Sequence, residues 1–197
     1  MKLNLPNKLT VLRIIMIPLF MIFVLYPVGG EAVARIVAAV LFALTALTDL
    51  LDGKIARKYG LVTNFGKFMD PLADKMMVFA ALLSICTSGM YLHIKAVFVW
   101  VSAVIIFREL AVTSIRLVAA GSSDKAVISA SWLGKVKTTV QCIAIVVIIL
   151  EPLVNIFLPS YNLYILSWLG VALMTLFTVW SGVDYIKTYW KYINPNV

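Results

Sequence analysis

Six apolar stretches occupy most of this chain, and each is long enough as an α-helix to cross a hydrocarbon core of about 30 Å. They run through residues 9–28, 33–56, 68–88, 95–119, 132–150 and 163–186. Since they consume most of the 197 residues, of which 62% are hydrophobic, no independent soluble domain fits beside them. We therefore expect an all-α integral membrane protein: one domain over residues 1–197, with six transmembrane helices and a short N-terminal interfacial segment.

The connections between these stretches differ in basic charge. Lys and Arg concentrate at both termini and after the second and fourth stretches, as Lys2, Lys8, Arg13, Lys54, Arg57, Lys58, Lys67, Lys125, Lys135, Lys137, Lys187 and Lys191. The other connections hold only Lys95. The positive-inside rule then places both termini in the cytoplasm, in a multi-pass protein of the plasma membrane. The net charge of +8 lies mostly on that face, where it attracts anionic headgroups or phosphate-bearing substrates.

Four of the nine acidic residues lie between Asp49 and Asp74, inside hydrophobic sequence. A carboxylate within a bilayer costs at least about 2.5–3.5 kcal/mol, so such a cluster needs a compensating ligand. Asp49 and Asp52 are three residues apart and Asp70 and Asp74 are four apart, so each pair projects to one helix face. No His or Cys accompanies them, and oxygen ligands favour Mg²⁺, Mn²⁺ or Ca²⁺. The spacing predicts two helices that converge on one or two divalent cations.

Small residues follow the first acidic pair on the same stripe. Gly53 and Ala56 leave room for a ligand to approach the backbone, and Arg57 places a positive charge one turn beyond Gly53. A structural alternative also accounts for the carboxylates, which would then form interhelical salt bridges or lie at solvated helix ends. The basic residues available for such salt bridges are Lys54, Arg57, Lys67 and Lys75.

The acidic and small residues form one continuous pattern. It reads Asp49-x-x-Asp52-Gly53-x-x-Ala56-Arg57, then eight residues, then Gly66-x-x-x-Asp70-x-x-x-Asp74. This pattern resembles the signature of the CDP-alcohol phosphotransferase family, and none of its fixed residues is changed. The flanking segments NLPNKLTVLR and FGKFMDPLADK are similar to the bacterial branch whose acceptor is glycerol 3-phosphate. The resemblance extends over essentially the whole chain.

The resemblance implies a reaction and a site. Such a protein transfers a phosphatidyl group from CDP-diacylglycerol to sn-glycerol 3-phosphate, giving phosphatidylglycerophosphate and CMP in anionic phospholipid biosynthesis. It also implies that Asp49, Asp52 and Asp70 ligate Mg²⁺ or Mn²⁺, and that Asp74 contacts the metal and serves as general base. The implied donor-binding residues are Asp49, Asp52, Gly53, Ala56, Arg57 and Gly66. A homodimer is implied as well.

The segment PNKLTVLR adds three polar residues at the start of the first helix. Asn7, Thr10 and Arg13 are placed to donate hydrogen bonds to the nucleotide of the donor. The alternative is structural: Asn7 caps the helix and Arg13 contacts lipid headgroups. The sequence leaves both interpretations open.

The acceptor's phosphate needs cationic ligands, and polar residues interrupt the fourth and fifth stretches. Arg108 and Glu109 lie well inside an apolar segment, where an unpaired charge is costly, so we expect them to face the bundle interior. An Arg fork suits a phosphorylated acceptor. The expected phosphate-binding set is Arg108, Arg116, Lys135, Lys137, Thr138 and Gln141. The alternative is an Arg108–Glu109 network with Lys side chains that extend to the interface.

Other functions stay open at this point. Serine, inositol phosphate or phosphatidylglycerol could replace glycerol 3-phosphate, because the aspartate pattern handles only the shared donor. A divalent-cation transporter would also use an acidic cluster, but this cluster lies at helix ends rather than at the bilayer midplane. Nucleic acid is not an expected partner, because the basic residues are scattered among helix ends.

Two surface features complete the expectations. Aromatic residues at the end of the last stretch are typical of an interfacial belt, and they are Trp180, Tyr185, Tyr189, Trp190 and Tyr192. Small residues in the second stretch would permit close helix contacts in a homodimer, and they are Ala38, Ala39, Ala43 and Ala46.

Overall fold

The computed structural model describes residues 4–59, 63–121, 131–158 and 163–190, apart from the side chains of residues 50–58, 67, 120 and 121. The described chain is helical throughout its regular elements. These are α1 (Leu5–Leu25), α2 (Glu31–Tyr59), α3 (Asn64–Thr87), the short 3₁₀ helix η1 (Gly89–Tyr91), α4 (Leu92–Gly121), α5 (Trp132–Phe157) and α6 (Ile165–Thr188).

Polar side chains fix where several helices begin. Asn4 caps α1 by accepting from the backbone N–H of Asn7 at 3.1 Å, and Pro6 fits the first turn because it needs no N–H partner there. Thr63 caps α3 and Ser131 caps α5 in the same way. These caps set the starting points of the three helices that carry most of the polar residues considered below.

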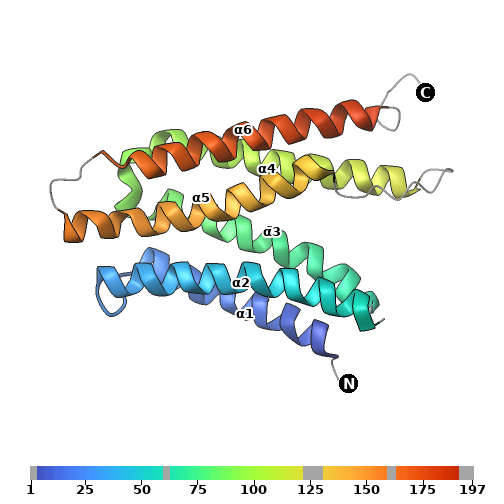
Figure 1. The fold of residues 1–197 in the computed structure, drawn as a ribbon, viewed down its shortest axis with the longest axis horizontal. Coiled ribbons are helices and arrows are strands. Elements are labelled where there is room, and N and C mark those ends of the chain that lie inside the picture. The colour runs from blue at the N-terminus through green and yellow to red at the C-terminus, as the bar shows by residue number, and fades with distance from the viewer. Residues whose placement is uncertain (1–3, 60–62, 122–130, 159–162, 191–197) are drawn as a thin grey trace.

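The start of α6 is held by a neighbouring helix instead. Glu151 of α5 is buried, and its carboxylate accepts from the N–H groups of Leu166 and Ser167 at 2.8 and 2.5 Å. A carboxylate at a helix N-terminus satisfies unpaired donors and interacts favourably with the helix dipole. This contact ties the end of α5 to the start of α6, at the end of the bundle opposite to the start of α1 (Figure 1).

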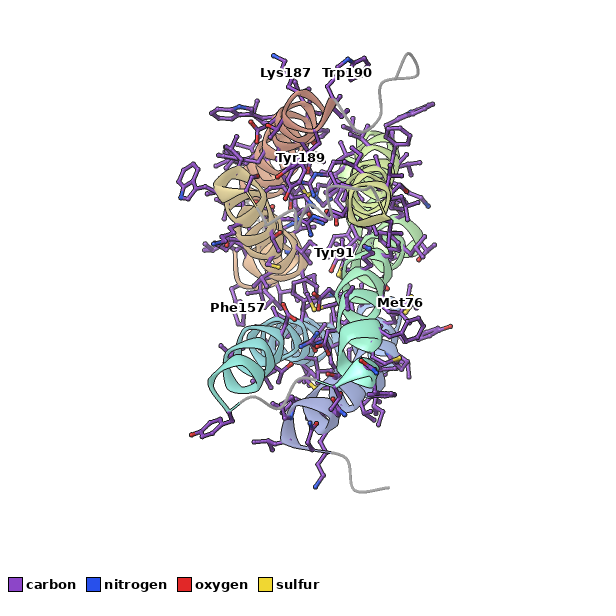
Figure 2. The ribbon with its side chains drawn as sticks, turned by 90° about the vertical axis from the view of Figure 1, so that its right-hand side faces the viewer. Met76, Tyr91, Phe157, Lys187, Tyr189 and Trp190 are labelled. Carbon is purple, nitrogen blue, oxygen red and sulfur yellow. The ribbon has the colours of Figure 1, made fainter. Side chains whose placement is uncertain are left out.

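The helices form two groups of three. One group contains α1, α2 and α3, the other contains α4, α5 and α6, and the groups meet through α2 against α5 and α3 against α4 (Figure 1). Seen end on, Tyr91 lies between them, whereas Phe157, Lys187 and Trp190 point outward (Figure 2). The ends of α2, α4 and α6 and the starts of α1, α3 and α5 lie toward the same end of the bundle (Figure 1).

The apolar side chains divide between a core and an outer surface. A single cluster of buried residues runs through the bundle, and Phe42, Ile85, Phe98 and Ile145 are among its largest members. Many Leu, Ile, Val, Phe and Trp side chains are exposed on the outside. An apolar exterior over so many helices is the surface of an integral membrane protein, because lipid tails, unlike water, solvate it. The all-α membrane fold expected from the sequence is confirmed.

The expected count of six spans is supported for five. Among the described residues, five segments are long and apolar enough to cross a membrane. They are α1, the part of α2 from Glu31 to Asp49, the segment Gly89–Ala119 formed by η1 and most of α4, α5, and α6. α3 has a similar length, but Asp70, Asp74 and Lys75 lie in its first half and reduce its apolar character. A sixth span along α3 stays a prediction.

Three local expectations need correction. Residues 5–8 form the first turn of α1, so the described part of the expected N-terminal segment is continuous with that helix. α5 continues through Pro152 to Phe157, because Glu151 and Pro152 are buried against neighbouring helices rather than placed in a connection. Ala38 and Ala39 are buried inside the protomer, where they pack in its own core. They are therefore not available as a dimer surface.

Candidate active site

Two carboxylates on different helices meet at one arginine. Nη1 of Arg13, from α1, lies 3.0 Å from Oδ1 of Asp49 in α2 and 2.6 Å from Oδ1 of Asp74 in α3. The Arg13 side chain is fully buried, whereas the carboxylates are 37% and 45% exposed. The guanidinium therefore offsets the repulsion between the two aspartates and leaves both open to a ligand.

The third described aspartate is oriented by the same helix. The hydroxyl of Thr10, one turn before Arg13, donates to Oδ1 of Asp70 at 2.6 Å. Asn7, a turn earlier, accepts from the hydroxyl of Thr63 at 3.0 Å. We name Asn7, Thr10, Arg13, Asp49, Asp70 and Asp74 the aspartate cluster. One face of α1 thus contacts both helices that carry the acidic pairs.

Gly66 permits this close approach. A Cβ at Gly66 would lie 3.2 Å from Oδ1 of Asn7 and 3.5 Å from Oδ2 of Asp70. A methyl group there would press on polar atoms that α1 and α3 bring together. The glycine at position 66 therefore leaves room for α1 and α3 to approach each other.

Part of the predicted donor site lies outside the described residues. Asp52, Gly53, Ala56 and Arg57 belong to α2, but their side chains are not among those described, and neither are those of Lys54 and Lys67. The pairing that is described uses Arg13, which was not among the expected salt-bridge partners. The alternative interpretation, in which Arg13 contacts lipid headgroups, is wrong because its side chain is buried. The cap of α1 is Asn4 rather than Asn7.

The described carboxylates suit a hard divalent cation. Asp49 and Asp74 both contact Nη1 of Arg13, so the two carboxylates lie near each other. The donors around them are oxygens, the ligands that Mg²⁺ and Mn²⁺ prefer. Among the described side chains, no three acidic, His or Cys residues lie together as a metal site, and the side chain of Asp52 is outside the described part of the chain.

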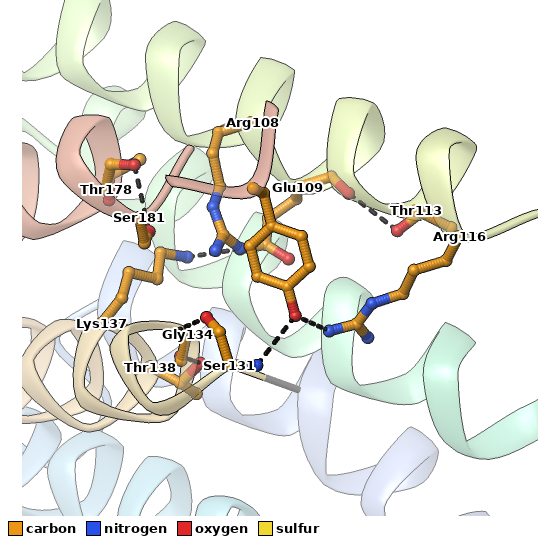
Figure 3. Close-up of polar contacts among 11 residues, drawn as sticks. Arg108, Glu109, Thr113, Arg116, Ser131, Gly134, Lys137, Thr138, Thr178 and Ser181 are labelled. Carbon is orange, nitrogen blue, oxygen red and sulfur yellow. Dashed lines mark hydrogen bonds and ion pairs between the residues drawn. The ribbon is translucent and has the colours of Figure 1, made fainter. Parts of the chain in front are cut away.

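A second polar cluster lies between α4, α5 and α6 (Figure 3). Lys137 is buried, and its Nζ donates to Oε1 of Glu109. Nη1 of Arg108 donates to the same oxygen at 3.2 Å. Breaking such a buried pair would leave an uncompensated charge. The Arg108–Glu109 contact expected as a structural alternative is present, and Lys137 extends it.

Arg108 nevertheless keeps hydrogen-bonding capacity. Its side chain is 10% exposed, and its Nε and Nη2 have no hydrogen-bond partner within the described part of the chain. Gln141, one turn after Lys137, is also buried, and neither atom of its amide has a partner among the described residues. Buried polar groups are normally paired, so both side chains are candidates for contact with a ligand.

Arg116 joins this cluster through a tyrosine. Its Nη2 donates to the hydroxyl of Tyr185 at 2.5 Å, and the backbone N–H of Ser131 donates to the same hydroxyl at 3.1 Å (Figure 3). We name Arg108, Glu109, Arg116, Lys137, Gln141 and Tyr185 the basic pocket. Tyr185 is almost completely buried, so its assignment to an interfacial aromatic belt is wrong. Trp180 and Trp190 are exposed as a belt requires, and Tyr192 lies outside the described residues.

Two predicted acceptor residues stand apart from the basic pocket. Lys135 and Thr138 are exposed, and the hydroxyl of Thr138 donates to the Gly134 carbonyl of its own helix at 3.0 Å. Their role stays a prediction. The sequence missed Glu109 as a partner of Lys137, and it missed Arg13 and Tyr185 as organising residues. The buried charge pattern of α4 was the signal for Glu109, but no local signal identifies the partners of Arg13 or Tyr185.

The two clusters approach each other across the α2–α5 contact. The thiol of Cys142, on α5, is close enough to Lys137, Asp49 and Asp74 for all three charges to act on it. A substrate that reaches the aspartate cluster therefore has the basic pocket nearby. This arrangement suits a reaction between two phosphorylated molecules.

Comparisons with known proteins agree with this geometry. The chain is 43% identical to the CDP-diacylglycerol–glycerol-3-phosphate 3-phosphatidyltransferase of Bacillus subtilis strain 168, over 95% of this chain and 96% of that protein. It is 40% identical to a probable phosphatidylglycerophosphate synthase of Mycobacterium tuberculosis H37Rv, over 93% and 80%. It is 34% identical to the 3-phosphatidyltransferase of Yersinia enterocolitica, over 97% of each chain. The model of the CDP-alcohol phosphatidyltransferase family matches residues 3–180. This chain therefore belongs to the CDP-alcohol phosphatidyltransferase family.

Proposed function

We propose that this membrane protein is a CDP-diacylglycerol–glycerol-3-phosphate 3-phosphatidyltransferase. It would transfer the phosphatidyl group to sn-glycerol 3-phosphate and release CMP. The observation that carries the proposal is the approach of an aspartate cluster to a basic pocket, in a chain similar to relatives of that name. The aspartate cluster supplies the chemistry shared by the family, and the basic pocket favours a phosphorylated acceptor.

The aspartate cluster would bind the donor and move one proton. Asp49, Asp52, Asp70 and Asp74 would hold Mg²⁺ or Mn²⁺, which when bound offsets the charge on the donor's pyrophosphate. Asp74 would take the proton of the acceptor hydroxyl, whose oxygen attacks the phosphorus of the phosphatidyl group. The bond between that phosphorus and the CMP oxygen breaks, and CMP leaves.

Other residues of the aspartate cluster and of its surroundings would orient the donor and the carboxylates. Arg13 fixes Asp49 and Asp74 relative to each other, and Thr10 fixes Asp70. Asn7, Gly53, Ala56, Arg57 and Gly66 would receive the cytidine and its phosphates. A positioned carboxylate is a better base than its ordinary basicity suggests, because the acceptor hydroxyl is held beside it.

The basic pocket would bind the acceptor's phosphate. Arg108 offers two nitrogens, Nε and Nη2, that have no partner among the described residues, and Arg116 and Lys137 add positive charge. Gln141 would contact the phosphate or a glycerol hydroxyl, with Lys135 and Thr138 at the exposed side. Glu109 balances Lys137 and Arg108 in the absence of acceptor.

Purified protein in detergent tests the assignment. Given CDP-diacylglycerol and Mg²⁺, it should release CMP with glycerol 3-phosphate, and little with serine, inositol phosphate or phosphatidylglycerol. Preference for another acceptor would contradict the substrate assignment and keep the family chemistry. Absence of CMP release together with divalent-cation flux into proteoliposomes would instead support a transporter.

Arg116 provides a test of the basic pocket. We expect Arg116→Ala to raise the KM for glycerol 3-phosphate roughly 10- to 100-fold, the effect of losing one charge-assisted contact. The KM for CDP-diacylglycerol should change little, because that substrate binds at the aspartate cluster. Steady-state kinetics with both substrates varied measures this. Lys95→Ala, which removes a cation from the opposite end of α4, is the control. An unchanged acceptor KM would place the phosphate site elsewhere.

The proposed site faces the cytoplasm of the cell, and two observations support this orientation. Asp49 and Arg116 lie toward the ends of α2 and α4, and Lys135 and Lys187 lie at the start of α5 and the end of α6. These four helix ends point toward the same end of the bundle (Figure 1). CDP-linked nucleotides and glycerol 3-phosphate are charged molecules that a cytoplasmic site would reach. A cysteine introduced at exposed Asn64, in a background with Cys86→Ala and Cys142→Ala, should react with an impermeant maleimide only after cells are opened. Labelling in intact cells would show that the site faces the outside and would contradict the proposed orientation.

We also propose that the protein is a homodimer. Light scattering of the detergent-solubilised protein measures its mass and checks this proposal.

A further inference from the structure

Tyr185 lies at the centre of the basic pocket although it carries no charge. Its hydroxyl accepts from Nη2 of Arg116 at 2.5 Å and from the backbone N–H of Ser131 at 3.1 Å. Its ring lies 5.6 Å from the guanidinium carbon of Arg108 and 5.3 Å from that of Arg116. One side chain of α6 thus contacts two arginines of α4 and the start of α5.

Two glycines lie beside this arrangement. A Cβ at Gly182, on α6, would lie 3.2 Å from Cγ of Arg108. A Cβ at Gly134, on α5, would lie 3.5 Å from Cε2 of Tyr185 and 3.9 Å from Nη2 of Arg108. A side chain at Gly182 would press on Arg108, whereas a methyl group at Gly134 would only come into van der Waals contact with the ring. The guanidinium of Arg108 lies over the ring, and its Nε and Nη2, which have no hydrogen-bond partner among the described residues, can bind a ligand.

We propose that Tyr185 is a positioning residue for the acceptor's phosphate, which orients the guanidinium groups of Arg108 and Arg116 without touching the reacting atoms. The inference rests on the proposed function of the basic pocket. Arginine has several rotatable bonds, so a free guanidinium loses conformational entropy when it binds a phosphate. The cation–π contacts of the ring and the hydrogen bond of the hydroxyl restrict that freedom before the acceptor arrives.

Removal of the hydroxyl and removal of the ring should differ in effect. Tyr185→Phe keeps the ring and deletes the contacts to Arg116 and Ser131, so the KM for glycerol 3-phosphate should rise roughly 10-fold. Tyr185→Leu also deletes both cation–π contacts, so the rise should reach roughly 100-fold. In both variants kcat and the KM for CDP-diacylglycerol should stay within about two-fold, because neither the base nor the donor site is touched.

A double-mutant cycle tests whether Tyr185 acts through Arg116 or independently of it. If Tyr185 acts through Arg116, Arg116→Ala should raise the acceptor KM less in the Tyr185→Phe background than in the wild type. Calorimetric titration of the detergent-solubilised protein with glycerol 3-phosphate should show the same coupling in binding alone. Tyr26→Phe, an exposed tyrosine at the other end of the bundle, is the matched control.

The outcomes are distinct. A selective rise in the acceptor KM with coupling to Arg116 supports the inference. An unchanged acceptor KM in Tyr185→Phe, or effects that simply multiply with those of Arg116→Ala, overturns it. An equal rise in both KM values with loss of a monodisperse elution peak shows a merely structural role and also overturns it. Failure of the wild-type protein to release CMP with glycerol 3-phosphate is seen before any variant is made, and refutes the proposed function itself.

Discussion

Replacement of Asp74 with Asn is expected to lower kcat by roughly 10²–10⁴-fold, the usual effect of losing a general base. The change preserves the shape of the side chain and removes its charge and its ability to take the proton of the acceptor hydroxyl. Oδ1 of Asp74 contacts Arg13 at 2.6 Å, and an amide oxygen can keep a weaker form of that contact. The loss should therefore appear mainly in turnover, with a smaller change in the KM for CDP-diacylglycerol.

Steady-state kinetics with both substrates varied, and a single-turnover measurement of CMP release, check this expectation. Glu31→Gln is a suitable control, because it removes an exposed carboxylate from the start of α2, at the end of that helix away from Asp49. A near-normal kcat for Asp74→Asn would remove the base assignment from Asp74. The candidate base would then have to be another carboxylate of the aspartate cluster.

Removal of divalent metal is expected to abolish CMP release, and added Mg²⁺ or Mn²⁺ should restore it. Asp49→Asn and Asp70→Asn should each lower activity by at least roughly 100-fold, since even changes beyond the direct ligands of a metal commonly cost 10- to 100-fold. The two variants differ in their protein contacts, because Asp49 pairs with Arg13 and Asp70 accepts from Thr10. A similar loss in both would indicate a shared ligand role rather than either local contact.

The control for this experiment is Thr10→Val, which keeps the shape of Thr10 and removes its hydrogen bond to Asp70. If Asp70 mainly ligates metal, Thr10→Val should lower activity much less than Asp70→Asn and should raise the Mg²⁺ concentration needed for half-maximal activity. Full activity after thorough chelation would contradict the metal model. In that case Arg13 would be the main cation between Asp49 and Asp74.

The spacing of polar residues within one helix was readable from the sequence. Apolar stretches of about 20 residues predicted membrane helices, because a bilayer sets the length that a helix needs to cross it. Intervals of three and four residues placed Asp49 with Asp52, and Asp70 with Asp74, on common helix faces. Helical periodicity is a local property of the chain. The family pattern followed from the same intervals and predicted the chemistry.

The partners of those residues across helices depended on the tertiary structure. Arg13 meets Asp74 over 61 positions of sequence, and Arg116 meets Tyr185 over 69. A periodic pattern gives the face on which a side chain lies but not the helix packed against that face. The pairing and rotation of helices follow from simultaneous packing of all their buried surfaces. The sequence by itself therefore determined the helices, the acidic pairs and the family, whereas only packing decided that Arg13 joins the aspartates and that Tyr185 joins the arginines.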